Sequence, residues 1–219
     1  MFLLINKPAG ITSHDVIDRL RLITGQRRIG HAGTLDPFAT GLLIVGVGRE
    51  STKQLNQFLK LNKSYTATLV FGATSDTQDV TGRITPTPVV TPLSPAAVAA
   101  AVTKFQGQQL QTPPMYSAKK IQGKKLYELA RQGKTVKRQP AEIEIKKIAM
   151  LDYTWPRLTI TVECSSGTYI RMLGHDLGAN LGVGAYVEAL QRTAIGKYQL
   201  ADAVGLDKLM AENWQGYTF

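Results

Sequence analysis

The most informative segment of this chain reads Gly30-His31-Ala32-Gly33-Thr34-Leu35-Asp36-Pro37-Phe38-Ala39-Thr40-Gly41-Leu42-Leu43. A single carboxylate, Asp36, lies in it among glycines and directly before Pro37. Proline biases the residue before it toward an extended or turn conformation, and glycine allows positive φ and close approach of the backbone. The apolar run from Leu42 to Val47 then predicts a buried strand. We therefore expect Asp36 to be held rigidly in a loop above a sheet, where a nucleophile is useful. A plain turn or capping role is the ordinary alternative.

The residues outside this loop predict a mixed α and β chain. Thr12 and Asp15 have capping-box spacing, and an apolar stripe of helical period follows them as far as Gly25. From Tyr65 to Phe71, apolar and polar residues alternate as they do on a half-buried strand. The expected elements are strands at 2–5, 42–47, 65–71, 143–150 and 158–164, and helices at 12–25, 55–59, 94–105, 124–132 and 168–181. Short connections between successive strands favour a largely antiparallel central sheet flanked by helices.

The charge composition indicates a polyanionic partner. The 219 residues include 26 Lys and Arg against 16 Asp and Glu, a formal net charge of +10. This surplus is clustered, since the segment from Lys119 to Lys147 holds ten Lys or Arg and three Glu. Clustered positive charge suits the phosphates of a nucleic acid, although a solvated charged face has the same composition. The length allows one large domain, with or without a small lobe.

The composition argues against several other classes of protein. Cys164 is the only cysteine, so an internal disulfide is impossible and a reducing compartment fits. Three His and one Cys without ligand-like spacing make a metal site improbable. The chain has no apolar run long enough to span a bilayer, and the run from Phe2 to Ile5 is too short for the core of a signal peptide. We expect a cytoplasmic protein without a metal.

The segment around Asp36 resembles the catalytic-aspartate motif of the pseudouridine synthases, in the form found in the TruB family of tRNA pseudouridine-55 synthases. Four further blocks agree with that family in type and order, along nearly the whole chain. They are 6–10 with Thr12-Ser13, 63–65, 113–119 with 123–127, and 164–171. The resemblance implies the pseudouridine synthase fold with a catalytic cleft, and an isomerase that flips its target base and needs no cofactor.

The resemblance implies that Asp36, Tyr65 and Arg171 are the catalytic residues. Asp36 would attack either the sugar or the base, a choice that the residues leave open. Arg171 would pair with Asp36, keep it ionised and orient its oxygens; otherwise, an arginine in an early helical turn faces solvent. Tyr65 would lay its ring against the target base, with its phenol near the C5 proton. Core packing is the usual fate of a tyrosine on a strand.

Further residues are expected around the substrate because of the same resemblance. His31 would enter the space that the flipped nucleotide leaves, and Lys7 would lie behind the active site as a scaffold. Leu190 would cap the base pocket, and Tyr169 belongs to the block that ends at Arg171. Each has an ordinary alternative: a structural histidine, a surface lysine, or a core leucine at helical spacing.

The resemblance also implies the partner. The basic segment, with Lys119, Lys124 and Lys125, would hold the T-stem and loop of tRNA. We expect one catalytic domain over 1–219, with 85–147 as an RNA-gripping lobe or insertion, acting as a monomer without an obligatory protein partner. The family usually continues into a small C-terminal domain of the PUA type, for which the residues before Phe219 leave no room. A minimal form and a shortened piece of a longer protein both fit.

Three functions are compatible with these residues. The first is a guide-free isomerase that converts the uridine at position 55 in the T-loop of tRNA to pseudouridine. The second is a non-catalytic protein that binds or folds tRNA on the same scaffold, which loss of Asp36, Tyr65 or Arg171 would have favoured. The third is a guide-dependent relative within a ribonucleoprotein, against which the expected absence of the C-terminal domain counts.

Overall fold

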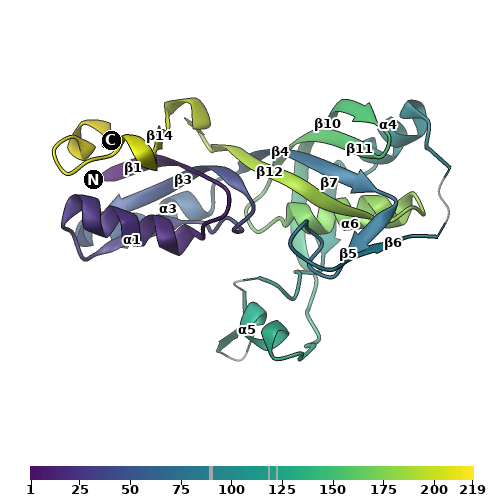
Figure 1. The fold of residues 1–219 in the computed structure, drawn as a ribbon, viewed down its shortest axis with the longest axis horizontal. Helices are drawn as coiled ribbons and strands as arrows, with labels where there is room; N and C mark the ends of the chain where they lie inside the picture. Colours follow the sequence, from purple (N-terminus) through teal and green to yellow (C-terminus); the bar gives the residue numbers. More distant parts are fainter. Residues whose placement is uncertain (89–90, 118, 122) are drawn as a thin grey trace. The chain divides into compact units, whose positions relative to one another are not determined.

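The computed structural model describes residues 1–88, 91–117, 119–121 and 123–219. The chain divides into two compact units, which are described separately (Figure 1). The first unit contains Met1–Thr66 and Leu190–Phe219, and the second contains Ala67–Ala189. The second unit is therefore an excursion of the chain between two parts of the first.

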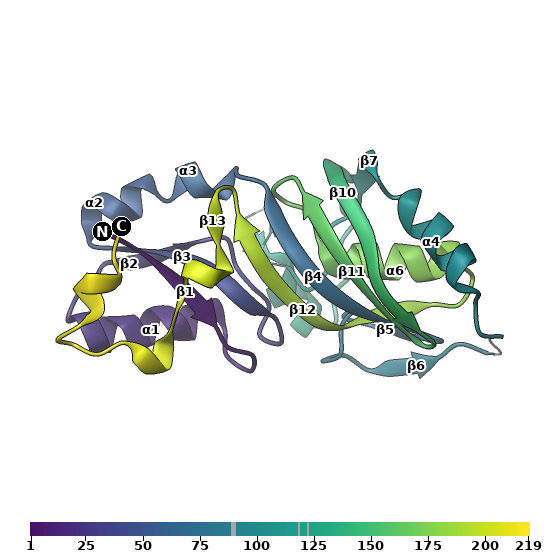
Figure 2. The same cartoon turned by 90° about the horizontal axis from the view of Figure 1, so that it is seen from above.

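The first unit is built on a sheet with helices on both faces (Figure 2). Its elements before the excursion are β1 (Phe2–Lys7), α1 (Ser13–Thr24), β2 (Ile29–Ala32), β3 (Thr40–Val47), α2 (Arg49–Gln54) and α3 (Asn56–Leu59). After it come the end of β12 (Ala185–Ile195), β13 (Tyr198–Gln199), β14 (Val204–Gly205) and three short 3₁₀ turns at Leu200–Asp202, Leu206–Lys208 and Trp214–Tyr217. The strand order is β14-β1-β3-β12, with β2 against β3 and β13 against β12. β1 is antiparallel to β3, whereas β14 is parallel to β1 and β12 is parallel to β3.

Alternation along β1 and β3 gives the first unit two apolar layers. Leu3 and Val45 point to the same side, where they pack in a cluster with Leu20 of α1 and with Trp214. Leu4 and Ile44 point to the other side, where Phe58 of α3 covers them. Because both faces are covered, every residue of β3 after Thr40 is buried. The strand that follows the Asp36 loop is thus fixed on both sides.

The second unit is a second stretch of sheet with its own helices. Its elements are β4 (Lys63–Phe71, from Ala67 on), β5 (Ala73–Ser75), β6 (Ile84–Pro86), α4 (Pro95–Thr103), β7 (Gly107–Gln111), β8 (Lys120–Ile121), β9 (Lys124–Lys125), α5 (Leu126–Arg131), β10 (Ala141–Thr154), β11 (Arg157–Cys164), α6 (Ile170–Asn180) and the start of β12. The order is β12-β4-β11-β10-β7. A Cβ at Gly174 would lie 2.9 Å from Leu69 Cδ2, and one at Gly178 would lie 2.3 Å from Ala185 N. Two glycines therefore let α6 pack closely against β4 and β12.

The expected fold class is confirmed: a mostly antiparallel sheet is flanked by helices. The helix predicted by the capping box is α1, where Thr12 accepts a hydrogen bond from Asp15 N and Gly25 ends the helix at φ 67°. The strand predicted over 42–47 is β3, and the alternation from Tyr65 to Phe71 lies in β4.

The structure also contains elements that the sequence did not predict, among them β2, β7 and α2, and three differences bear on the candidate residues or on the strands beside them. β10 continues to Thr154, four residues beyond the predicted end. Its end was not predicted because register shifts after Ile145 and Met150 interrupt the alternation that marks a strand in sequence. The helix expected over 124–132 begins only at Leu126, because Lys124 and Lys125 pair with β8. β12 is unpredicted, since its first three residues are all buried and show no alternation. Leu190 therefore lies on a strand and not on a helix.

Candidate active site

The loop that carries Asp36 is fastened to the N-terminal segment of the first unit. Asp36 O accepts from Ala39 N at 3.1 Å, which closes a tight turn. Pro37 O accepts from Gly10 N at 2.9 Å. On the other side of Asp36, Ser13 Oγ accepts from Leu35 N at 2.9 Å and donates to Leu35 O at 3.2 Å. Backbone atoms of both neighbours of Asp36 are thus hydrogen-bonded, and its side chain is only partly buried.

Lys7 also holds the Asp36 loop, through hydrogen bonds from its side chain to backbone carbonyls. Its side chain is fully buried, and Nζ donates to Pro8 O and Ile11 O at 2.8 Å each and to Pro37 O at 3.3 Å. Burial lowers the pKa of Lys7 from 10.5 to about 8, and the attraction of Asp36 opposes that shift. A surface role for Lys7 is therefore wrong. Its contacts fit the scaffold that the sequence suggested.

A second buried cation, Arg192, supports the loop from strand β12. Its side chain is 2% exposed, and it donates from Nε to Leu42 O at 2.7 Å and from Nη2 to Gly33 O at 3.0 Å. These carbonyls lie before and after Asp36 in sequence. Gly41 has φ +103°, and a Cβ there would lie 2.3 Å from Arg192 O. Sequence reasoning missed Arg192; its position in a mostly apolar segment, two residues after Leu190, is the signal that could have found it.

The remaining first-unit candidates lie on strands. His31 is on β2 opposite Val45, and in the described part of the chain its buried Nδ1 has no hydrogen-bond partner. Burial, together with the nearby charges of Arg192 and His14, lowers the pKa of His31 from 6.5 to about 4. Tyr65 on β4 and Leu190 on β12 are 9% and 7% exposed. This low exposure is typical of side chains that pack in a core, which is the ordinary alternative for both residues.

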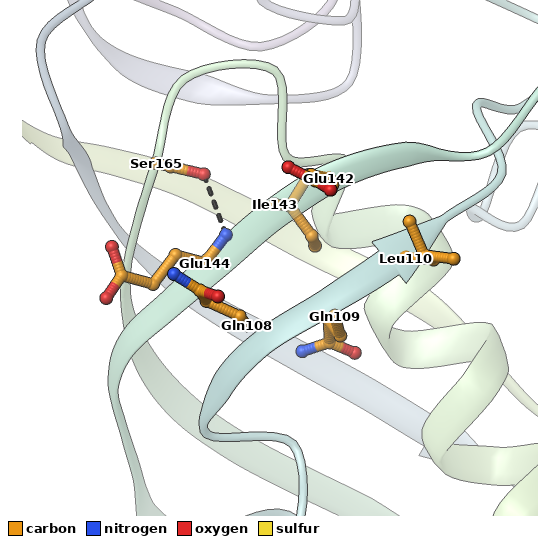
Figure 3. Close-up of a pocket in the computed structure, with 7 residues that line it drawn as sticks. All are labelled: Gln108, Gln109, Leu110, Glu142, Ile143, Glu144 and Ser165. Carbon is orange, nitrogen blue, oxygen red and sulfur yellow. Dashed lines mark hydrogen bonds between the residues drawn. The ribbon is translucent and has the colours of Figure 1, made fainter.

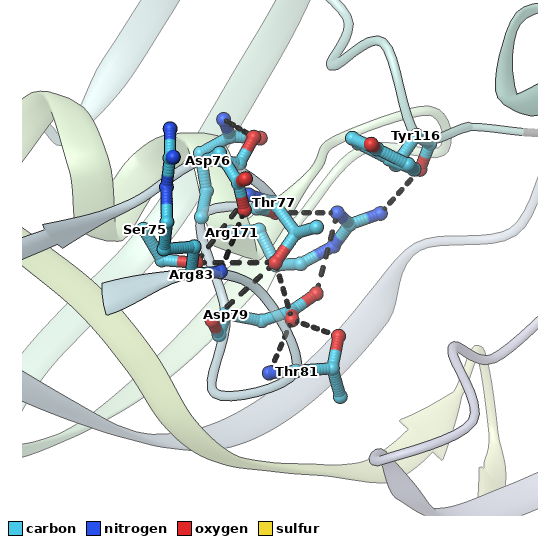
Figure 4. Close-up of polar contacts among 9 residues, drawn as sticks. Ser75, Asp76, Thr77, Asp79, Thr81, Arg83, Tyr116 and Arg171 are labelled. Atoms are coloured by element: carbon cyan, nitrogen blue, oxygen red, sulfur yellow. Dashed lines mark hydrogen bonds and ion pairs between the residues drawn. The ribbon is translucent and has the colours of Figure 1, made fainter. Parts of the chain in front are cut away.

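In the second unit, Arg171 is a buried cation with several hydrogen-bond partners (Figure 4). It lies in the first turn of α6 with 3% of its side chain exposed, so a solvent-facing arginine is excluded. Nη1 donates to Thr77 O at 2.8 Å and lies 3.4 Å from Asp79 Oδ2, while Nη2 donates to Tyr116 O at 2.7 Å. The guanidinium plane is therefore held by groups from two separate segments of the chain.

Asp79 and Gln111 hold the surroundings of Arg171 in place. Asp79 is also buried, and its Oδ1 accepts from Thr77 Oγ1 at 2.8 Å and from Thr81 N at 2.9 Å. Tyr169 is the N-cap residue of α6. The Gln111 amide donates to Tyr169 O at 3.1 Å and accepts from Tyr169 N at 2.8 Å. An amide can serve a backbone donor and acceptor at once, so Gln111 fixes the start of the helix that carries Arg171.

The basic candidates lie around β8, β9 and α5. Lys119 and Lys124 are exposed, as expected of residues that meet a polyanion. The side chain of Lys125 falls outside the described residues. Leu126 N donates to Lys119 O at 2.9 Å, which ties the start of α5 to this segment. Their role in binding stays a prediction.

The structure groups the candidates by unit. Asp36, Lys7, His31, Tyr65 and Leu190 belong to the first unit, and Arg171, Tyr169, Lys119 and Lys124 belong to the second. The pairing of Asp36 with Arg171 thus stays a prediction. Within the described residues, no group of three or more His, Cys, Asp or Glu could hold a metal ion, and no helix is long and apolar enough to cross a membrane.

A cleft of about 440 Å³ in the second unit has a different character (Figure 3). Gln108, Gln109 and Leu110 of β7 line it together with Glu142 and Glu144 of β10. Ser165 Oγ accepts from Glu144 N at 2.9 Å at its rim. Two carboxylates and no cation among the lining residues make this cleft a poor site for a phosphate.

Comparison with known proteins identifies similar families and structures. The model of the N-terminal domain of the TruB family pseudouridylate synthases matches residues 21–170, and that of the tRNA pseudouridylate synthase B C-terminal domain matches residues 171–217. The chain is 45% identical over 210 residues to the tRNA pseudouridine synthase B of Opitutus terrae, covering 95% of this chain and 86% of that protein. It is 45% identical over 208 residues to that of Geobacter sulfurreducens, covering 95% of this chain and 68% of that protein.

Solved structures share the fold. A chain in the crystal structure of a Cbf5-Nop10-Gar1 complex is 25% identical with a TM-score of 0.73, covering 94% of this chain and 52% of that one. A chain in a structure of an H/ACA RNP bound to a substrate RNA containing 2'-deoxyuridine is 22% identical with a TM-score of 0.72, covering 98% of this chain and 54% of that one.

Proposed function

The chain belongs to the TruB family of pseudouridylate synthases, and on that premise we propose that it converts the uridine at position 55 in the T-loop of tRNA to pseudouridine. It acts on the tRNA alone, without a guide RNA, as a monomer in the cytoplasm. The relatives at 45% identity are named tRNA pseudouridine synthase B and cover most of the chain, which supports tRNA as the substrate.

The observation that carries the proposal is the fastening of the Asp36 loop. Lys7, Ser13 and Arg192 hold its backbone from Gly33 to Leu42, while the carboxylate between these anchors stays partly exposed. A catalytic group needs a support that fixes its geometry to a fraction of an ångström. A loop with a purely structural aspartate has no need of two buried cations, each of which costs several kcal/mol to desolvate.

The chemistry follows from the balance of the reaction. The N1–C1′ bond of the uridine breaks, a C5–C1′ bond forms, the C5 proton leaves and N1 takes up a proton, so product and substrate are isomers. Asp36 acts as the nucleophile. Tyr65 lays its ring against the base, an interaction worth about 1–3 kcal/mol, and its phenol assists removal of the C5 proton. Arg171 orients the Asp36 carboxylate.

The other candidates are assigned to binding. His31 fills the space left by the flipped nucleotide, and Leu190 and Tyr169 bound the base pocket. Lys119, Lys124 and Lys125, within an RNA-gripping lobe over 85–147, contact the backbone of the T-stem and loop. Exposure of Lys119 and Lys124 supports this assignment.

The test uses an unmodified tRNA transcript and the protein alone, followed by mapping of pseudouridine. We expect Asp36→Asn to bind the tRNA as wild type does but to lose turnover by about 10³-fold or more, the scale seen when a nucleophile is removed. The exposed Asp202→Asn is the matched control and keeps full turnover. Tyr65→Phe keeps binding and loses most turnover.

Each outcome has a clear meaning. Wild-type turnover in Asp36→Asn would overturn the assignment of the nucleophile, and wild-type turnover in Tyr65→Phe would remove its part in proton transfer. Binding of tRNA by the wild-type protein without any product would support the non-catalytic tRNA-binding protein instead. Product that forms only when a guide RNA is added would support the guide-dependent relative.

A further inference from the structure

An open basic cleft of about 550 Å³ lies in the first unit. Of the residues given a role in the proposed function, only His31 lines it. Arg21, Arg27 and Arg28 line it together with His14 and His31. Its other lining residues are apolar or neutral, and they include no Asp or Glu. This cleft therefore combines a hollow shape with lining side chains of net positive charge, which favours an anion.

The arginines are displayed from a fixed piece of backbone. Helix α1 ends at Gly25 in the left-handed conformation, which turns the chain toward β2. Arg21 Nε donates to Arg27 O at 3.3 Å, and Gly48 N donates to Arg28 O at 2.8 Å. The side chains of Arg27 and Arg28 are nevertheless exposed. A hydrogen-bonded backbone lowers the ordering cost of binding, because only the side chains and not the loop then have to be immobilised.

The charge of the cleft comes mainly from Arg27 and Arg28. Arg21 Nη1 lies 2.6 Å from Asp18 Oδ1, so part of its charge is balanced. Burial keeps the pKa of His31 near 4, so this imidazole is neutral at physiological pH. A guanidinium presents a planar fork that matches two phosphate oxygens. Two adjacent forks on a fixed backbone are a suitable receptor for a phosphodiester.

Strand β2 connects the cleft to the Asp36 loop along the chain. Strand β2 carries Ile29, Gly30 and His31, all of which line the cleft, and Asp36 follows His31 by five residues. A strand rises about 3.3 Å per residue, so the backbone advances roughly 10 Å from Arg28 to His31. A phosphate held by Arg28 thus belongs to a nucleotide close to the one that reaches His31.

We infer that this cleft is a phosphodiester-binding subsite, in which Arg27 and Arg28 hold the RNA strand next to the nucleotide that enters the active site. The inference rests on the proposed function, because it takes the RNA strand at His31 to be the substrate. The subsite contributes binding and register, and it takes no part in the chemical step. An ordinary arginine-bearing surface would attract RNA without preference for any one phosphate.

The first experiment compares two double variants with the same loss of charge. Arg27→Ala/Arg28→Ala removes the pair in the cleft, and Arg19→Ala/Arg49→Ala removes two exposed arginines of the same unit that do not line it. Affinity for the tRNA transcript is measured from low to high salt. Each phosphate contact contributes about 0.7–0.9 to the salt slope, so the cleft variant should lose about 1.4–1.8 from the slope and roughly 10- to 100-fold in affinity. The control variant should change the affinity by less than about 3-fold.

The second experiment identifies the phosphate. A series of T-arm RNAs carries one uncharged methylphosphonate at successive positions around the target uridine. We expect one or two adjacent positions at which the substitution weakens binding to wild type but not to Arg27→Ala/Arg28→Ala. Equal losses in the two double variants, or an RNA series without any such position, would overturn the inference.

The readout is kept independent of turnover. All binding is measured in Asp36→Asn as well as in wild type, so the affinities do not depend on conversion of the RNA during the measurement. Suppose that wild type forms no pseudouridine, but one methylphosphonate position weakens binding to wild type and not to Arg27→Ala/Arg28→Ala. The proposed function then fails and the phosphodiester subsite stands. If wild type forms pseudouridine and the pair has no effect, only the subsite fails.

Discussion

Replacing Arg192 by Met tests whether the buried guanidinium holds the Asp36 loop. Methionine keeps much of the volume but cannot donate, so Leu42 O and Gly33 O lose the donors that now lie 2.7 and 3.0 Å away. A buried acceptor left without a partner costs about 1–3 kcal/mol, which gives roughly 2–6 kcal/mol for the two. Removal of a desolvated cation offsets part of this cost, so we expect a net loss of about 2–4 kcal/mol in the free energy of unfolding.

The assay is urea unfolding together with a thermal melt. For a chain of this length, each kcal/mol lowers Tm by about 2–4 °C, so the melt should fall by about 4–16 °C. Arg157→Met is the matched control, because Arg157 pairs with Glu188 at the surface at 2.8 Å, and such pairs are worth at most about 1 kcal/mol. Turnover at a temperature where Arg192→Met stays folded should drop on the order of 10²-fold, since a misplacement of about 1 Å has that effect. An unfolding free energy within 0.5 kcal/mol of wild type, on the order of an ordinary surface change, with unaltered turnover would refute this reasoning.

Three further predictions concern the same unit. Gly41→Ala should lower the free energy of unfolding in urea by about 2–4 kcal/mol, because Gly41 has φ +103° and its Cβ would meet Arg192 O at 2.3 Å; unchanged urea unfolding would contradict the close approach. The pKa of Lys7 is about 8 in the folded chain and 10.5 in the unfolded chain, so the folded chain binds fewer protons between pH 8 and 10.5. The free energy of unfolding should therefore rise over this pH range in wild type but not in Lys7→Met. The same pH dependence of the unfolding free energy in both proteins would contradict the lowered pKa. The pKa of His31 is about 4 in the folded chain instead of 6.5, so its NMR resonance should titrate near pH 4. That resonance is identified by its loss in His31→Gln, and the free energy of unfolding should fall as the pH drops from 6.5 to 4. Titration near pH 6.5 would show that the ring is not desolvated.

Local patterns were sufficient for the parts of the fold that depend on local physics. The capping box at Thr12, the glycine at the end of α1 and the alternation along β4 each involve neighbours in sequence, and each predicts the element found. The Asp36 loop is also readable, because proline and glycine restrict the backbone in ways that need no distant partner. The strand β12 was missed, because its first three residues are all buried and so lack the alternation that marks the start of a half-buried strand.

The supports of the candidate site depend on distant residues and could not be read locally. Arg192 reaches Gly33 O across 159 positions of the chain, and Gln111 reaches Tyr169 across 58. An arginine or a glutamine looks the same in sequence whether it faces solvent or satisfies a buried carbonyl. Only the topology that brings β12 beside β3 reveals what Arg192 does.

The split of the first unit into two chain segments has a consequence for biosynthesis. Strand β3 acquires β12 as a neighbour only after the ribosome has added the 67–189 excursion, a delay of roughly 6–25 s at about 5–20 residues per second. During that time, the second unit can complete its own strand pairs while the Asp36 loop still lacks Arg192. The nascent chain should therefore secure its Asp36 loop only after the 67–189 segment has been synthesised, and a chaperone that shields apolar β3 during this delay would raise the yield of folded protein.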